Sequence, residues 1–220
     1  MALARTLQLD EAERAHLFDL ARATGRQGAP RQPRPPRPRV RPVVQRILDQ
    51  MVMPATVSDV LGDLLAANQL GRALYAPVLD SPEQPANTAR FTFLDPAATE
   101  FFPDWDRVAD DVVARLRSEA GRNPFDQGLS NLVGELATRS DEFRARWAAH
   151  NVRFHRSGTK RLRHPVVGQL ELSYEALPLA GDNGLSLNIF TADAGSGSQH
   201  ALDLLASWVA SEAPHPVDTV

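Results

Sequence analysis

Residues 104–168 read DWDRVADDVVARLRSEAGRNPFDQGLSNLVGELATRSDEFRARWAAHNVRFHRSGTKRLRHPVVG, and this stretch decides the fold of the chain. Apolar residues recur at helical spacing in three successive blocks, which begin after Asp104, Asp126 and Ser140. Because aspartate and serine cap helix N-termini, the stretch predicts three consecutive helices. After His150 the apolar period changes to two, which is typical of β-strands. No nucleophile motif, metal-ligand cluster or phosphate-binding loop interrupts the stretch, so it favours a domain that holds an apolar molecule over an enzyme.

Strand-like segments lie on both sides of these helices. Residues 152–164, 169–179 and 185–189 are separated by turn residues and predict three consecutive antiparallel strands. Two shorter strands are expected earlier, at 56–60 and 63–66. Two early strands, a central helical block and three late strands form an α+β plan. By analogy with PAS-like sensor folds, we predict an antiparallel sheet of about five strands with a helical block on one face, preceded by an isolated N-terminal helix.

The composition divides the chain into segments. Residues 9–24 have one apolar face and predict a lone helix near the N-terminus. Residues 26–42 contain six arginines, six prolines and no acidic residue, which is typical of a semi-rigid cationic linker. We place the main domain at residues 43–211, with a closing helix at 201–209, and expect a flexible tail at 212–220.

The composition also restricts the class of protein. The chain has 220 residues and a formal net charge of −3, so the whole chain is not a polyanion binder. It contains no cysteine, which excludes disulfide scaffolds, thiol catalysis and cysteine zinc sites. No apolar run reaches the ~18–20 residues that span a membrane, and the N-terminus lacks a secretion signal. We therefore expect a cytoplasmic protein. Lys160 is the only lysine, which we attribute to GC-rich coding.

Four phrases of the sequence together resemble one known family. They are ATVSDVLGDLLAANQLGRALYAPV (55–78), FTFLDPAATEFFPDWDRVADDVVARLRSEAGRNP (91–124), LVGELATRSDEFRARWAAHNVR (132–153) and SGTKRLRHPVVGQLELSYEAL (157–177). In order and spacing they are similar to the MmyB-like ligand-binding domain of helix-turn-helix transcription regulators of the XRE class. The resemblance implies a PAS-like domain that holds a fatty-acid-like molecule and controls DNA binding through a homodimer.

The N-terminal part departs from the pattern of that family. Residues 7–23 are similar to the last helix of its DNA-binding domain, so we expect residues 1–25 to be a remnant of a helix-turn-helix domain that is mostly absent from this chain. The family usually has a tryptophan where this sequence has Ala67. The resemblance therefore implies DNA as a partner through a domain that the chain largely lacks, and a pocket with one aromatic wall missing.

The candidate ligand contacts combine apolar side chains of the helical block with polar side chains on the following strands. Ligand pockets are concave and mainly apolar, with a few polar groups. In this hypothesis, a guanidinium from Arg153 or Arg161 would hold a ligand carboxylate in a bidentate fork, and His150 and Tyr174 could share this task. The complete predicted set is Phe91, Trp105, Val112, Leu116, Phe143, Trp147, His150, Arg153, Arg161 and Tyr174.

These residues also have a purely structural interpretation. Aromatic side chains at helical spacing usually belong to the core. The arginines of the first late strand then form a solvated face that pairs with Glu171 and Glu175 across the hairpin, and each exposed pair contributes little to stability.

Metal binding and catalysis receive little support. His150, His155 and His164 are separated by five and nine residues, which matches no compact ligand motif. A structural role explains them better, because His164 and Pro165 shape the hairpin turn and His150 ends a helix. We predict no metal, no cofactor and no enzymatic activity.

Two hypotheses remain for the function. The first is a ligand-sensing regulatory domain, and the alternative is a dimerisation or protein-interaction module with no ligand. The linker adds a weaker expectation, since arginines beside prolines resemble arms that enter the DNA minor groove. Arg34, Arg37 and Arg39 are the candidate DNA contacts, although a spacer explains the same composition.

Overall fold

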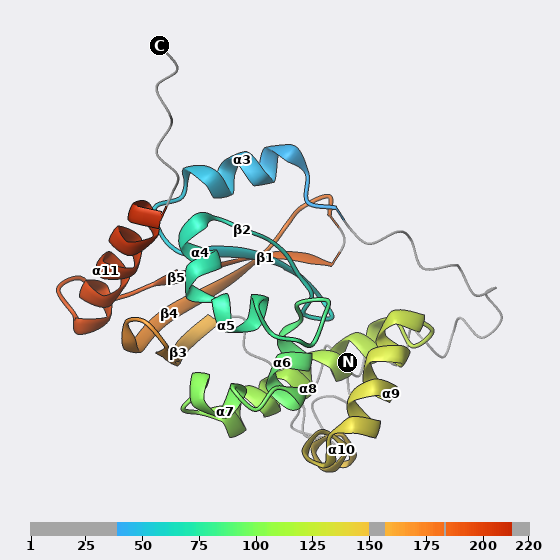
Figure 1. Ribbon diagram of the computed structural model, residues 1–220. Helices are drawn as coiled ribbons and strands as arrows, with labels where there is room; N and C mark the ends of the chain where they lie inside the picture. Colours follow the sequence, from blue (N-terminus) through green and yellow to red (C-terminus); the bar gives the residue numbers. More distant parts are fainter. Residues whose placement is uncertain (1–38, 150–156, 183, 213–220) are drawn as a thin grey trace, which may run out of the picture.

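The computed structural model describes residues 39–149, 157–182 and 184–212 (Figure 1). Its centre is one antiparallel sheet with the strand order β2-β1-β5-β4-β3. The strands are β1 (Ala55–Asp59), β2 (Leu64–Ala67), β3 (Ser157–His164), β4 (Gly168–Pro178) and β5 (Leu185–Thr191). The predicted α+β class with a five-stranded antiparallel sheet is confirmed. The predicted helix at 9–24 lies outside the described residues.

The helices begin where the sequence offers caps. Asp126 Oδ1 accepts a hydrogen bond of 2.8 Å from the amide of Leu129, and Ser140 Oγ accepts one of 3.1 Å from the amide of Phe143. Both predicted caps are confirmed. The helices of the described segments are α3 (Pro42–Gln50), α4 (Gln69–Leu74), α5 (Ala76–Leu79), α6 (Thr88–Leu94), α7 (Ala98–Phe101), α8 (Trp105–Arg122), α9 (Gln127–Arg139), α10 (Asp141–Ala148) and α11 (Gly197–Glu212).

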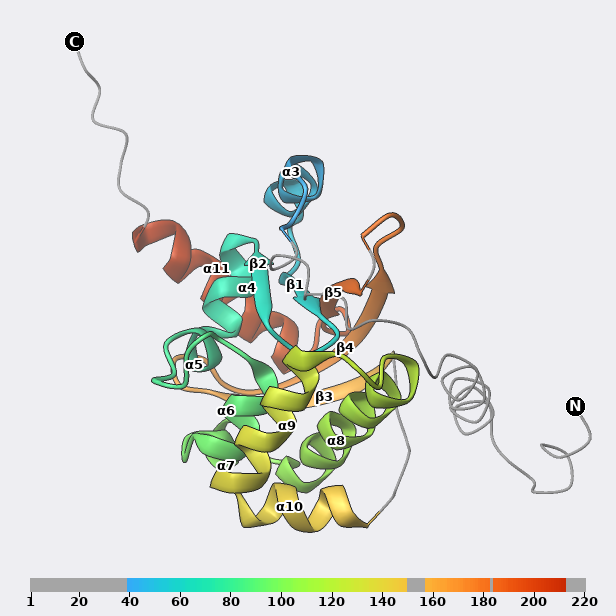
Figure 2. The same cartoon turned by 90° about the vertical axis from the view of Figure 1, so that its right-hand side faces the viewer.

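The predicted helical block lies on one face of the sheet. Figure 2 shows α8, α9 and α10 grouped on the side of the sheet away from α3. Leu116, Leu132 and Phe143 join these helices in one buried cluster. At the other end of the same face, Leu202 and Leu205 of α11 pack with buried leucines of β3 and β4.

Helix α3 covers the opposite face. Its buried side chains Val44 and Leu48 pack on a patch of β1 and β5 that consists of Ala55, Val57, Leu185 and Leu187. Since side chains alternate between the two faces of a strand, the intervening residues of β1 and β5 must point toward the helical block. These intervening residues are mostly polar, and they form one wall of the site described next.

Candidate functional site

A cavity of about 420 Å³ lies between the helical block and the sheet. This volume is within the range of small-molecule sites, roughly 300–1,000 Å³. One wall is a face of α8, where Val108, Val112 and Arg115 recur at helical spacing. The opposite wall consists of inward residues of the sheet, namely Thr56, Ser58, Lys160, Tyr174, Ala176, Ser186, Asn188 and Phe190.

Aromatic side chains surround a single ammonium group in one part of the cavity. Lys160 Nζ lies 3.3 Å from the hydroxyl oxygen of Tyr75. It also lies 5.3 Å, 5.9 Å and 6.0 Å from the ring centroids of Tyr174, Tyr75 and Phe190. Aromatic faces attract cations at such distances. This part of the cavity therefore combines an apolar wall with a positive charge.

Hydroxyl and amide groups line another part. The amide nitrogen of Asn188 donates to Ser58 Oγ over 3.0 Å and to Thr56 Oγ1 over 3.4 Å. The strand register places Tyr174 opposite Phe190, and Ala176 opposite Asn188. Because successive inward residues of a strand lie two positions apart, the aromatic pair and the polar group occupy successive rows of the sheet. The cavity is thus amphiphilic rather than uniformly apolar.

A charged cluster borders the cavity where β1 ends. Burial raises the pKa of Asp59, and the neighbouring Asp63 adds to this shift. Burial lowers the pKa of Arg115, while the carboxylates of Asp59 and Asp63 oppose this effect. Nη2 of Arg115 donates to Thr88 Oγ1 over 3.1 Å. A Cβ atom on Gly62 would lie 2.5 Å from the same Nη2, and Gly62 has a φ of +93°, so only glycine fits there.

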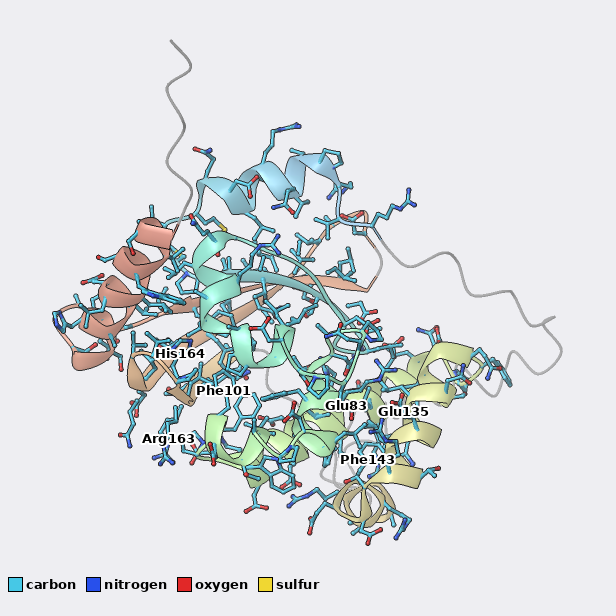
Figure 3. All side chains as sticks on the ribbon, viewed as in Figure 1. Glu83, Phe101, Glu135, Phe143, Arg163 and His164 are labelled. Carbon is cyan, nitrogen blue, oxygen red and sulfur yellow. The ribbon has the colours of Figure 1, made fainter. Side chains whose placement is uncertain are left out.

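Two of the ligand contacts predicted from the sequence, Val112 and Tyr174, line this cavity. Three others, Phe91, Leu116 and Phe143, are buried in the core, with at most 1% of each residue exposed, and do not line it. Figure 3 shows Phe143 among the helices of the block, away from the sheet.

The two predicted tryptophans lie between helices. Trp105 Nε1 donates to the carbonyl oxygen of Thr92 over 2.9 Å. The ring of Trp147 stacks on Phe143 with a centroid distance of 5.5 Å, and the guanidinium of Arg117 lies 5.1 Å above the Trp147 ring. Neither tryptophan lines the cavity.

The predicted arginines lie elsewhere or outside the described residues. Arg161 Nε donates to Asp104 Oδ2 over 2.6 Å, and its Nη2 contacts the other carboxylate oxygen. Hydrogen bonds from Arg161 lower the pKa of Asp104, whose carboxylate pairs with this arginine instead of capping the described amides of α8. Arg39 is exposed. The positions of His150, Arg153, Arg34 and Arg37 fall outside the described residues.

Most residues that line the cavity were not predicted from the sequence, and Lys160 is the charged one among them that the strand pattern could have revealed. The signal for it was present, because Leu162 is an evident core residue and Lys160 has the same parity in the strand. Lys160 pairs with the buried Leu172 of β4, which places both on the inner face. Because the single lysine of this arginine-rich chain has the parity of a core residue, it was a candidate ligand contact.

The described residues contain no group of three or more histidine, aspartate or glutamate side chains placed to hold a metal ion. Within the same residues, no helix has the length and apolar character needed to cross a membrane.

Comparison with known proteins identifies the family. The sequence model of the MmyB-like transcription regulator ligand binding domain matches residues 40–205. A search of curated proteins finds no significant match. The family match covers the whole sheet, the helical block and the cavity between them. Because it also covers well over half of the sequence, the chain belongs to the family of MmyB-like transcription regulator ligand-binding domains.

Proposed function

We propose that the cavity binds a small amphiphilic organic molecule and that its occupancy regulates DNA binding by a helix-turn-helix transcription regulator. The observation that carries this proposal is the cavity of about 420 Å³ with an aromatic part and a hydrogen-bonding part. A fatty-acid-like molecule, which the family resemblance implies, is one such ligand. Among the contacts expected from the sequence, Val112 and Tyr174 are the ones that this proposal retains.

Ligand binding would act through α8, because this helix forms one wall of the cavity and also the centre of the helical block. Val112 lines the cavity and belongs to the buried cluster with α9 and α10. A molecule that fills the cavity stabilises one position of α8 and thereby shifts the population of the helical block. The effect on DNA then passes through the arrangement of two copies of the chain.

Replacing Ala176 with phenylalanine is expected to weaken ligand binding strongly. Ala176 is an inward residue of β4 that lines the cavity, so a phenyl ring there occupies ligand volume. We expect the dissociation constant of any ligand that protects the wild type in a thermal-shift screen of fatty acids to rise about tenfold or more.

The matched control is Ser173→Phe, which adds the same ring to the exposed face of the same strand. This variant should bind as the wild type does. Native mass spectrometry and solvent extraction of the purified wild-type chain test the proposal itself. Recovery of no small molecule, together with no thermal shift from any compound of the screen, would favour the alternative of an interaction module without a ligand.

Exposed apolar side chains on two helices support the proposal of a homodimer. Ile47 of α3 is 52% exposed, and Leu204 and Trp208 of α11 are 52% and 40% exposed. Contiguous exposed apolar groups mark protein-protein interfaces. Ile47 lies one helical turn from the exposed Val43, and Leu204 lies one turn from Trp208. We expect Ile47→Glu to shift the chain toward monomers in sedimentation velocity, whereas Val166→Glu, at an exposed apolar position of the β3–β4 turn, has no effect. Equal sedimentation of Ile47→Glu and the wild type would exclude α3 from the interface.

A further inference from the structure

We infer that Lys160 binds the anionic group of the ligand, so that the protein recognises an organic anion through the ammonium group of its only lysine. This inference rests on the proposed function of the cavity. It adds the residue that binds the anionic group and the direction in which the ligand lies in the cavity.

The position of Lys160 is that of a recognition residue. It lies on the edge strand β3, and its side chain is partly buried and lines the cavity. An ammonium group has three hydrogen-bond donors. Within the described part of the chain, one of them donates to Tyr75. The surrounding rings of Tyr75, Tyr174 and Phe190 offer aromatic faces but no carboxylate, so donors remain for a bound anion.

The other cations of the cavity differ from Lys160 because they have acidic neighbours. Nη2 of Arg107 lies 4.0 Å from Asp104, and Nη1 of Arg122 lies 3.9 Å from Glu119. Arg115 interacts with the carboxylates of Asp59, Asp63 and Asp111.

No acidic side chain of the described residues lies within 4.0 Å of Lys160 Nζ to form an ion pair. A partly buried charge is stabilised by an opposite charge. Among the described cations that line the cavity, the charge of Lys160 is therefore the one that a bound anion would stabilise most.

The register of the sheet then orients the ligand. The anion lies beside Tyr174 and Phe190, and the next inward row of the sheet holds Ala176 and Asn188. The small side chain of Ala176 leaves room for the body of the ligand between the sheet and Val112 of α8. The far end of the ligand faces the hydroxyl and amide groups around Asn188.

The experiment compares matched charged and neutral probes on the full chain. The probes are saturated monocarboxylates and the primary alcohols of the same chain lengths, and binding is measured by calorimetry. For Lys160→Met we expect carboxylate affinity to fall about 10- to 100-fold, because hydrogen bonds to charged groups contribute this much. Alcohol affinity should change by less than about twofold, since methionine keeps the length and apolar stem of lysine.

Two further variants separate charge from folding. Arg163→Met removes an exposed cation from β3, the same strand as Lys160, and Figure 3 labels Arg163. This variant should bind every probe as the wild type does. Lys160→Glu should lose the carboxylates and bind the matched primary amines, which is a gain that a misfolded variant cannot show.

The outcomes separate this inference from the proposed function. If carboxylates and alcohols bind the wild type equally and Lys160→Met binds both as before, Lys160 does not recognise an anion, although the cavity still binds ligands. If no probe binds the wild type and no molecule is extracted from it, the proposed function and the inference fail together.

Discussion

Replacing Asn68 with alanine should lower the free energy of unfolding by about 4 kcal/mol. Asn68 is only 4% exposed. Its Oδ1 accepts hydrogen bonds of 2.7 Å from the amide of Gly71 and 3.0 Å from the amide of Ala55. Its Nδ2 donates to the carbonyl oxygens of Met51 and Met53 over 3.0 Å and 2.7 Å. The side chain thus uses its full hydrogen-bonding capacity.

The expected magnitude follows from the groups that alanine leaves behind. Loss of a helix N-cap costs about 1 kcal/mol, and each buried backbone group left without a partner costs about 1–3 kcal/mol. Asn68 caps α4 and also joins this helix to the first residue of β1 and to the connection after α3. One side chain therefore joins the start of β1, the N-terminus of α4 and the connection after α3.

Denaturant unfolding of three variants tests this account. Asn68→Ser keeps a capping oxygen but is too short for the other contacts, so its stability should lie between those of the wild type and Asn68→Ala. Asn131→Ala removes the same functional group from the exposed surface of α9 and should change stability by less than about 0.5 kcal/mol. If Asn68→Ala is no less stable than Asn131→Ala, the hydrogen bonds of Asn68 do not stabilise the fold.

Local features of the sequence predicted the elements of the fold well. The caps at Asp126 and Ser140 depend on side chains that bond to amides three residues later, so nearby residues determine them. The alternation of Leu170 and Leu172 in β4 likewise identifies the buried face without any knowledge of other strands. Asp104 was different, because its carboxylate pairs with Arg161, which is 57 residues away in the chain.

The lining of the cavity was harder to predict, because it depends on which buried residues meet a void. Val112 and Leu116 lie one helical turn apart on α8 and have the same apolar character. Val112 lines the cavity, whereas Leu116 is fully buried against the helical block. Hydrophobic periodicity reports burial but not the shape of the opposing surface. Only the register of β3, β4 and β5 brings Lys160 to the aromatic rings and Asn188 to the polar wall.

The second large effect is expected for His164→Leu, which should lower the free energy of unfolding by about 2–3 kcal/mol near pH 7.5. His164 is 2% exposed and lies at the end of β3 (Figure 3). Its Nδ1 faces the amides of Val166 and Val167 at 3.2 Å and 3.4 Å and therefore accepts. Its Nε2 must then carry the proton and donates to the carbonyl oxygen of Ala73 over 2.9 Å. These contacts agree with the predicted role of His164 in shaping the hairpin turn, and they require a neutral imidazole.

The neutral imidazole also makes the stability depend on pH. Burial lowers the pKa of His164 from its ordinary value of 6.5, so the unfolded chain takes up the proton first as the pH falls. The stabilisation is complete above about pH 6.5 and decreases below it, by at most about 1.4 kcal/mol per pH unit. Denaturation at about pH 7.5 and 5.5 should therefore show a smaller deficit of His164→Leu at the lower pH. His200→Leu, which changes an exposed histidine of α11, should keep the pH dependence of the wild type. If His164→Leu keeps it too, another group is responsible and the imidazole is not held neutral by the fold.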